Sequence, residues 1–166
     1  MTSQEQQRRF TEWAEAYDNI LWKVARSFAV GADQDDLHQE MLLALWQSVP
    51  AFRGDAKSST FVYRVAYNYA LGWIRKRRWK EVPIEYASQV AVVQQSENSP
   101  EAQVEMLYYL IRTLPELDRA IVLLYLDEVS YREISEVLGI GESNVGVRLN
   151  RLKKQLAERS GEVARA

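Results

Sequence analysis

The chain has 166 residues, of which 47% are hydrophobic, 21 are Lys or Arg, 23 are Asp or Glu, one is His and none is Cys. This apolar content predicts a packed protein of one domain or two small ones and excludes a largely disordered chain. The lack of Cys excludes disulfide scaffolds, Cys-based zinc sites and thiol catalysis, and a single His excludes multi-histidine metal sites, so no cofactor is expected.

No apolar run approaches the roughly 20 residues that span a bilayer, and the N-terminus lacks a signal-peptide layout. A cytoplasmic protein without membrane insertion is therefore expected. Its charge is unevenly spread: residues 51–80 carry a net charge of +7, between residues 1–50 at −4 and residues 81–120 at −5. Such a basic block predicts a local face for a polyanion, with an ordinary solvated helix face as the alternative.

Helical periodicity runs through the N-terminal half, and alternation with a period of two is absent, so the predicted fold class is all-α. The first helix is expected to end at Gly31 and to carry an apolar stripe of Phe10, Trp13, Tyr17, Ile20, Leu21, Val24 and Phe28. Asp33 to Asp36 are expected to cap and begin a second helix. That helix should stop at Pro50 and bury Leu37, Met41, Ala44, Leu45 and Val49.

A third helix is expected from about Thr60 to Trp79, after a loop over 52–59. It interleaves aromatic and basic side chains, a mixture that suits unpaired bases and their phosphates better than intact duplex. About half of the aromatic residues belong to the core on this interpretation, with Phe61, Val65, Tyr69 and Trp73 near one stripe. The second helix also carries a polar stripe, for which a solvated face is the alternative: Asp36, Gln39, Glu40, Leu43 and Gln47.

The helical pattern dissolves over 81–99, which predicts a linker. Ser99, Pro100 and Glu101 then form a helix start, and helices are expected over 100–113, 115–128, 131–138 and 142–158. Ser130 and Glu133 form a capping box, and a tight turn over 139–141 follows. The last helix should bury Val145, Leu149, Leu152 and Leu156, which completes a helix-turn-helix arrangement.

Polar and basic side chains remain on the other sides of that last helix. Asn can read adenine and Arg can read guanine through paired hydrogen bonds, whereas basic residues further along suit phosphates. A helical hairpin with a basic solvent face is the alternative to DNA binding. The residues predicted to face DNA are Ser143, Asn144, Val147, Arg148, Arg151 and Lys154.

Two sets of motifs occur in this order along the chain. The first comprises Asp36-Leu37-x-Gln39-Glu40, Leu45-Trp46, Ala51-Phe52-Arg53-Gly54, Thr60 to Asn68 and Arg75 to Arg78; the second comprises Leu114-Pro115-Glu116, Ser130 to Ile134, Leu138-Gly139-Ile140 and Val145-x-x-Arg148-Leu149-x-Arg151. Over about 10–80 and 100–157, the chain resembles bacterial RNA polymerase sigma factors of the extracytoplasmic-function group. Four residues depart from the usual family pattern, which bears on the upstream sequence preference: Ser135, Gly141, Gly146 and Val147.

The resemblance implies a factor that binds core RNA polymerase, directs it to specific promoters and assists their opening, without catalysis of its own. It implies two small helical domains: 1–80 for polymerase and the start-proximal promoter element, and 100–166 for the upstream element, joined by the linker 81–99. Core RNA polymerase and promoter DNA are the implied partners, with an anti-sigma protein as a further candidate.

The same resemblance assigns roles to individual residues of the N-terminal domain. Polymerase would be contacted by Asp36, Leu37, Gln39, Glu40 and Leu43. The start-proximal element, including a flipped base, would be contacted by Arg53, Lys57, Ser58, Ser59, Arg64, Tyr67, Asn68, Arg75, Lys76, Arg77 and Arg78.

Two other classes of protein stay open at this point. One is a stand-alone regulator, in which the helix-turn-helix binds an operator and the N-terminal helices dimerise. The other is a nucleic-acid enzyme or a hydrolase, which the single His, the lack of Cys and the lack of a Gly-rich phosphate loop disfavour.

Overall fold

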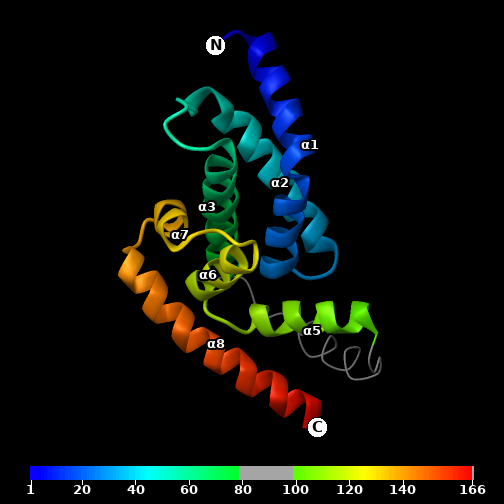
Figure 1. Cartoon of the computed structure of the whole chain (residues 1–166). Coiled ribbons are helices and arrows are strands. Elements are labelled where there is room, and N and C mark those ends of the chain that lie inside the picture. Colours follow the sequence, from blue (N-terminus) through cyan, green and yellow to red (C-terminus); the bar gives the residue numbers. More distant parts are fainter. Residues whose placement is uncertain (79–98, 166) are drawn as a thin grey trace. The chain divides into compact units, whose positions relative to one another are not determined.

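The computed structural model describes residues 1–78 and 99–165, and all its regular secondary structure within these ranges is helical (Figure 1). The predicted all-α class is thereby confirmed. The chain forms two compact units, the first holding the described residues up to 78 together with 136–139, and the second holding the other described residues. The linker predicted over 81–99 lies outside the described residues except for Ser99.

The first unit contains α1 (Ser3–Phe28), α2 (Ala32–Ser48), the 3-10 turn η1 (Val49–Ala51) and α3 (Ser58–Arg78). A capping box fixes the start of α1: the Thr2 hydroxyl accepts from the Glu5 amide at 3.2 Å, and the Glu5 carboxylate accepts from the Thr2 amide at 2.8 Å. The hydrogen bond that the Thr2 amide donates to the carboxylate favours its ionised form and is the largest cause of the lowered pKa of Glu5.

The start of α2 differs from the prediction. Its N-cap is Gly31, which has a φ of 61° and makes no side-chain cap hydrogen bond. Glycine accepts this left-handed conformation without the steric cost that a Cβ would bring. Asp33 and Asp35 lie in the first turn, where negative charge favours the helix dipole. The expectation that these acids cap the helix was therefore wrong, whereas their predicted place in its first turn is confirmed for Asp33 and Asp35.

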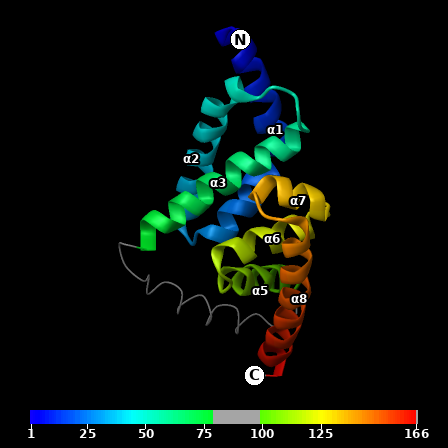
Figure 2. The ribbon, with the colours of Figure 1, turned by 90° about the vertical axis from the view of Figure 1, so that its left-hand side faces the viewer.

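Helices α1, α2 and α3 pack against one another, and the turned view shows α3 lying across the other two (Figure 2). The predicted stripe of α1 is confirmed for its buried members, Trp13, Ile20, Leu21, Val24 and Phe28, whereas Phe10 and Tyr17 are half-buried. The predicted core of α2 is confirmed for Leu37, Met41 and Leu45 and for Val49 in η1, whereas Ala44 is half-buried.

The core face of α3 is displaced from the predicted stripe. The side chains that point inward are Val62, Ala66, Tyr67, Ala70 and Ile74, whereas Phe61, Val65, Tyr69 and Trp73 are only partly buried. Small residues at the inward positions let a helix approach its neighbours closely, and larger aromatic rings then pack around the edge of the contact. The predicted stripe therefore lies at the edge of the core, because the closest helix contacts are made on the neighbouring side of α3.

The second unit contains α5 (Pro100–Arg112), α6 (Glu116–Leu126), the first residues of α7 (Tyr131–Leu138) and α8 (Glu142–Arg165). The predicted start of α5 is confirmed, since the Ser99 hydroxyl accepts from the Ala102 amide at 3.1 Å and Pro100 occupies the first turn. Helix α8 continues to Arg165, past the predicted end at 158. Side chains from α5, α6 and α8 form the buried core: Leu110, Ile111, Ile121, Leu124, Val145, Leu149 and Leu152. The predicted core of the last helix is confirmed for the three α8 members, whereas Leu156 is only partly buried.

Local contacts fix the turn between α7 and α8. The Ser130 hydroxyl accepts from the Glu133 amide at 3.2 Å, as the capping box predicts. Gly139 has a φ of 69°, and the Ser135 hydroxyl donates to the Ile140 carbonyl at 2.5 Å. These contacts confirm the predicted helix-turn-helix. Ser135 is one of the residues that depart from the family pattern, and its hydrogen bond to Ile140 helps to close the turn.

Candidate functional site

The polar stripe of α2 lies on the surface of the first unit. Asp36, Gln39, Glu40 and Gln47 are exposed, and Leu43 is 56% exposed among them. Leu37 differs, because its side chain is completely buried in the core. The prediction that Leu37 faces a partner was therefore wrong for this structure. Its side chain instead anchors the helix that presents the other residues predicted to contact polymerase, which are Asp36, Gln39, Glu40 and Leu43.

One carboxylate on this stripe is held in place from α3. The Tyr69 hydroxyl donates to Glu40 Oε2 at 2.9 Å. Partial burial and this hydrogen bond to a carboxylate both favour the neutral phenol, and together they raise the pKa of Tyr69. The hydrogen bond limits the rotamers of Glu40 and presents its charge in a defined place.

An aromatic cluster anchors the loop that leads into α3. The ring centroids of Trp13 and Phe52 lie 5.0 Å apart, and those of Phe52 and Phe61 lie 5.2 Å apart, both in edge-to-face geometry. This cluster fixes the start of the loop, while the basic side chains of Arg53 and Lys57 remain exposed. The loop therefore exposes two cationic side chains, and its start is anchored by the aromatic cluster.

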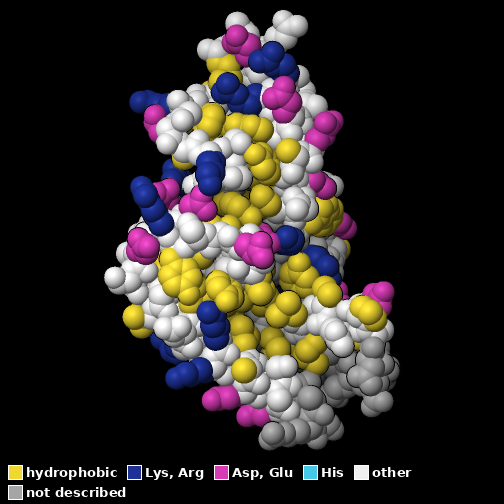
Figure 3. Space-filling view, in the orientation of Figure 1, with side chains coloured by type: hydrophobic (Ala, Val, Ile, Leu, Met, Phe, Trp, Pro, Cys, Tyr) yellow, Lys and Arg dark blue, Asp and Glu magenta, His cyan; other side chains and the backbone are white. Residues whose placement is uncertain are grey.

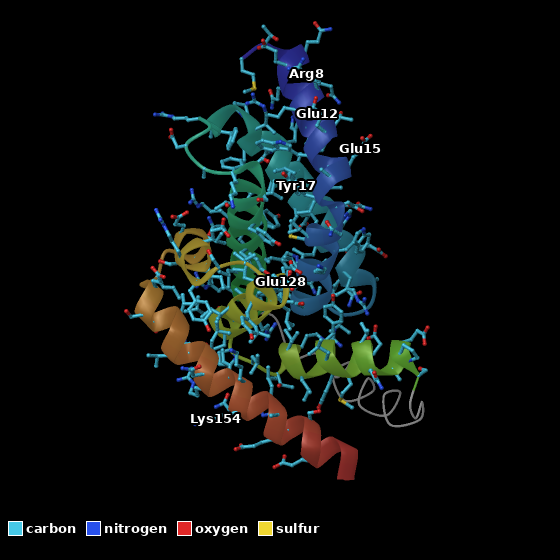
Figure 4. The ribbon with its side chains drawn as sticks, viewed as in Figure 1. Arg8, Glu12, Glu15, Tyr17, Glu128 and Lys154 are labelled. Carbon is cyan, nitrogen blue, oxygen red and sulfur yellow. The ribbon has the colours of Figure 1, made fainter. Side chains whose placement is uncertain are left out.

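The residues at the start of α3 are less accessible than the loop cations. The Ser58 hydroxyl shares a 2.6 Å hydrogen bond with the Tyr17 hydroxyl of α1, and both Ser58 and Ser59 are partly buried. Tyr17 comes from the middle of α1 (Figure 4). This bond joins the first turn of α3 to α1 and limits the freedom of Ser58.

Further along α3, Asn68, Arg75, Lys76 and Arg77 are exposed and Arg64 is partly buried. Tyr67 is only 1% exposed, with its ring centroid 6.3 Å from that of Tyr63 and 6.2 Å from that of Phe28. The structure thus contradicts the expectation that Tyr67 offers its ring to DNA, because the ring fills the core. The side chain of Arg78 lies outside the described part of the structure.

Arg77 is already engaged at the end of α3. Its guanidinium makes two contacts to the Asp33 carboxylate, one of them at 3.0 Å between Nη2 and Oδ1, and it lies 4.0 Å from the centroid of the Trp73 ring. The Arg77 side chain is 45% exposed and the Asp33 side chain is 33% exposed. Exposed pairs of this kind contribute little free energy, so phosphate oxygens can replace the carboxylate.

On α8, five of the six residues predicted to face DNA are exposed: Ser143, Asn144, Val147, Arg151 and Lys154. Figure 4 shows Lys154 projecting away from the helix. The side chain of Arg148 is only 31% exposed, because it turns back toward α6. The predicted face is therefore present, but its central arginine is held on the protein.

The group that holds this arginine is Asp118 of α6. Arg148 Nη1 lies 2.9 Å from Asp118 Oδ1, Arg148 Nε donates to Asn144 Oδ1 at 3.1 Å, and Arg151 Nη2 lies 3.4 Å from Asp118 Oδ2. The Asp118 side chain is 6% exposed. Sequence reasoning missed Asp118, because an acid in the first turn of a helix gives no signal of a partner thirty positions later.

Two further surfaces of the described residues carry a simple ion pair and a group of exposed hydrophobic side chains. Arg8, Glu12 and Glu15 lie along the exposed side of α1 (Figure 4), where Arg8 and Glu12 form a surface pair at 3.8 Å. Hydrophobic side chains show on the visible face over α5 and α6 (Figure 3), and exposed members on these helices are Val104, Leu107, Tyr125 and Leu126. Within the described ranges no acidic or histidine cluster suits a metal, and no helix has the length and hydrophobicity to cross a membrane.

Comparison with known proteins matches two family models to the chain. The Sigma-70 region 2 model matches residues 13–80, which span most of α1 and all of α2 and α3. The Sigma-70, region 4 model matches residues 105–156, which include α6, α7 and most of α8. The region 2 match falls in the first unit and the region 4 match falls in the second unit except for 136–139, and the two follow the order that the motifs predict.

Curated relatives and solved structures agree with these matches. The chain is 29% identical over 126 residues to the ECF RNA polymerase sigma factor SigM of Bacillus subtilis, covering 74% of this chain and 76% of the relative. It is 26% identical over 170 residues to SigW of the same organism, covering 92% and 91%.

Two solved structures share the fold. CnrH in complex with the cytosolic domain of CnrY aligns with a TM-score of 0.68 and 20% identity, over 94% of this chain and 90% of that one. The sigma factor RpoE in complex with the anti-sigma factor NepR from Bartonella quintana aligns with a TM-score of 0.69 and 17% identity, over 91% and 96%. The chain therefore belongs to the sigma-70 family, as a sigma factor of the extracytoplasmic-function group that directs RNA polymerase to promoters.

Proposed function

We propose that the exposed stripe of α2 is the surface of this sigma factor that binds core RNA polymerase. The stripe consists of Asp36, Gln39, Glu40 and Leu43, with Leu37 as its buried anchor. An exposed leucine among acidic and amide groups has the mixed character of a protein interface, with an apolar centre and a polar rim. The hydrogen bond from Tyr69 supports this assignment, because it fixes one of the charges before binding.

The start-proximal promoter element is assigned to the loop before α3 and to α3 itself. The exposed side chains that support this are Arg53, Lys57, Asn68, Arg75, Lys76 and Arg77, with Ser58, Ser59 and Arg64 beside them. Cationic side chains bind backbone phosphates, while a polar loop anchored by an aromatic cluster suits capture of an unpaired nucleobase. Tyr67 is left out of this contact set, since its ring is buried.

The upstream element is assigned to α8, the second helix of the helix-turn-helix. A helix in this position enters the major groove with the residues near its N-terminus against base edges. Ser143, Asn144 and Arg148 lie in that part of α8, and Arg151 and Lys154 follow where phosphates are expected. The proposed domains are accordingly 1–80 and 100–166, joined by 81–99.

The proposal assigns no catalytic step to this chain, which acts by positioning the polymerase that carries the chemistry, and it places the protein in the cytoplasm, where its polymerase works. An anti-sigma protein is proposed as a further partner. Both structural neighbours were determined as complexes, one of them with a protein described as an anti-sigma factor. The exposed hydrophobic residues of α5 and α6 offer a surface for such a partner.

The observation that carries the proposal is the pair of sigma-70 regions on two separate compact units, each exposing one polar or basic helix. The test is transcription in vitro from a library of promoter fragments, with bacterial core RNA polymerase alone and with this protein added. We expect a defined set of transcripts only when both are present, and weak DNA binding by the protein alone. Tight duplex binding without polymerase, and no new transcripts with it, would contradict the proposal and favour an operator-binding regulator.

A further inference from the structure

A buried carboxylate lies behind the DNA-facing side of α8. Asp118, on α6, is 4% exposed, and its two carboxylate oxygens contact two different arginines of α8. The Oδ1 atom lies 2.9 Å from Arg148 Nη1, and the Oδ2 atom lies 3.4 Å from Arg151 Nη2. One acid thus contacts two of the cations assigned to DNA.

Arg148 is held from two directions. Its Nη1 meets Asp118, and its Nε donates to Asn144 Oδ1 at 3.1 Å, one turn earlier on α8. An arginine with four rotatable side-chain bonds loses much conformational freedom when two of its nitrogens are fixed in this way. A guanidinium has five N–H donors, and these two contacts use one on Nε and one on Nη1. The guanidinium plane is therefore oriented before DNA arrives.

The same contact also reduces charge. A carboxylate at salt-bridge distance offsets part of the positive potential of the two guanidinium groups it touches. Affinity for DNA of any sequence rises with the number of cations that neutralise phosphates, whereas discrimination depends on donors fixed against base edges. A group that orients an arginine while offsetting its charge lowers general affinity and raises selectivity.

We infer that Asp118 is a specificity-determining positioning residue, which aims Arg148 at a base of the upstream element and suppresses binding of α8 to unrelated DNA. This inference rests on the proposed role of α8 in reading that element. Asp118 itself contacts no base, because it is buried beneath the arginines. Its effect should appear at the one or two base pairs that Arg148 reads.

The test uses the full chain with core RNA polymerase and promoter fragments randomised across the upstream element, with bound fragments sequenced. Wild-type holoenzyme should select a defined element. The Asp118→Asn variant keeps the size of the side chain and loses its charge. Its base preference at one or two positions of the upstream element should fall by roughly ten-fold, which is the lower part of the range for an arginine that makes two hydrogen bonds to a base. Its binding to unselected DNA at low salt should be equal to or tighter than that of the wild type. Glu158→Gln is the control for loss of one acid, since Glu158 is an exposed acid of α8.

Two more variants separate positioning from folding. Arg148→Lys keeps a cation beside Asp118 but lacks the planar guanidinium group, which can donate two hydrogen bonds to one base. It should therefore lose base preference at the same positions, and this result can be obtained even if Asp118→Asn does not fold. In the double variant, Asp118→Asn should add no further loss at those positions to that of Arg148→Lys. Unchanged selection by Asp118→Asn or by Arg148→Lys, or an equal loss at every position, would overturn the inference. Failure of the wild-type holoenzyme to select any element would instead contradict the proposed function.

Discussion

The two units hold an arginine on the face assigned to nucleic acid in different ways. In the first unit, Arg77 pairs with Asp33 and stacks on Trp73, and both partners of the ion pair are partly exposed. In the second unit, Arg148 pairs with Asp118, whose side chain is 6% exposed. An exposed pair is weak and exchanges readily, whereas a buried carboxylate without its partner is costly.

This difference corresponds to two tasks in promoter binding. A cationic side chain that binds backbone phosphates does not need a fixed direction. An exposed ion pair suits this role, because the cation can exchange its carboxylate partner for a phosphate of any sequence. A cation that reads a base edge needs a fixed direction, which a buried partner supplies. The comparison therefore predicts sequence-independent effects from changes at the end of α3 and sequence-dependent effects from changes on α8.

The most damaging single change should be Arg148→Ala, which removes the base-reading fork and leaves the Asp118 carboxylate with Arg151 at 3.4 Å. We expect the second unit to lose about 1–3 kcal/mol of stability and upstream-element discrimination to fall by roughly ten-fold or more. Chemical denaturation and transcription from matched and scrambled upstream elements measure the two effects. Core polymerase binding should be unchanged, and Arg159→Ala on the same helix is the control. Equal use of matched and scrambled elements by the wild type would remove the basis for this prediction.

Asp33 and Asp118 pair with arginines of this chain, whereas Asp36 and Glu40 are assigned to the surface that binds polymerase. The double variant Asp36→Lys with Glu40→Lys reverses two exposed charges on α2, and we expect association with core polymerase to weaken by roughly ten-fold, since like charges across an interface are costly. Co-purification and competition binding measure this loss. Glu12→Lys with Glu15→Lys on α1 is the matched control (Figure 4). Undiminished association in the α2 variant would contradict the assigned face.

A smaller effect is expected from Arg77→Ala. Because its ion pair is exposed, stability should change by less than about 1 kcal/mol. DNA affinity of the holoenzyme should fall to a similar extent on every sequence, and the slope of log affinity against log salt should decrease by about 1. Asp33→Ala is the informative control, since it releases the cation and should not weaken binding. A loss confined to particular sequences would break the distinction between the two units.

The smallest effect concerns Tyr69, whose pKa is raised by partial burial and by Glu40. The folded state favours the neutral phenol, so this contribution to stability is fully present below the unfolded-state pKa of about 10 and is lost as pH rises through the higher folded-state pKa. The stability advantage of the wild type over Tyr69→Phe should therefore shrink above about pH 10. Denaturation of both proteins near neutral and alkaline pH measures it, and a constant difference would show that Tyr69 does not titrate in this way.

Much of the architecture could be predicted from local sequence signals. Ser99 with Pro100, the Ser130 capping box and Gly139 each act through their own backbone within a few residues, and the structure confirms all three. The exposed stripe of α2 was also predictable, because its members recur at steps of one, three and four residues along one side of a helix.

Features that depend on partners far along the chain could not be predicted. The inward face of α3 is set by how closely α1 and α2 approach, which favours Ala66 and Ala70 over the larger rings. Tyr67 is followed by the exposed Asn68, and only packing shows that its ring is buried. The link from Asp118 to Arg148 spans thirty positions, and no local pattern in the sequence marks it.

The central claim is that two separate helical units contact different stretches of one promoter while bound to the polymerase. The most direct measurement places a photoreactive amino acid at Asn68 in one preparation and at Ser143 in another, and maps crosslinks in the complete promoter complex. We predict two non-overlapping DNA stretches, with the Asn68 crosslinks near the transcription start and the Ser143 crosslinks upstream, and both dependent on core polymerase. Crosslinks from both positions to a single stretch, or crosslinks at full yield without polymerase, would contradict the account.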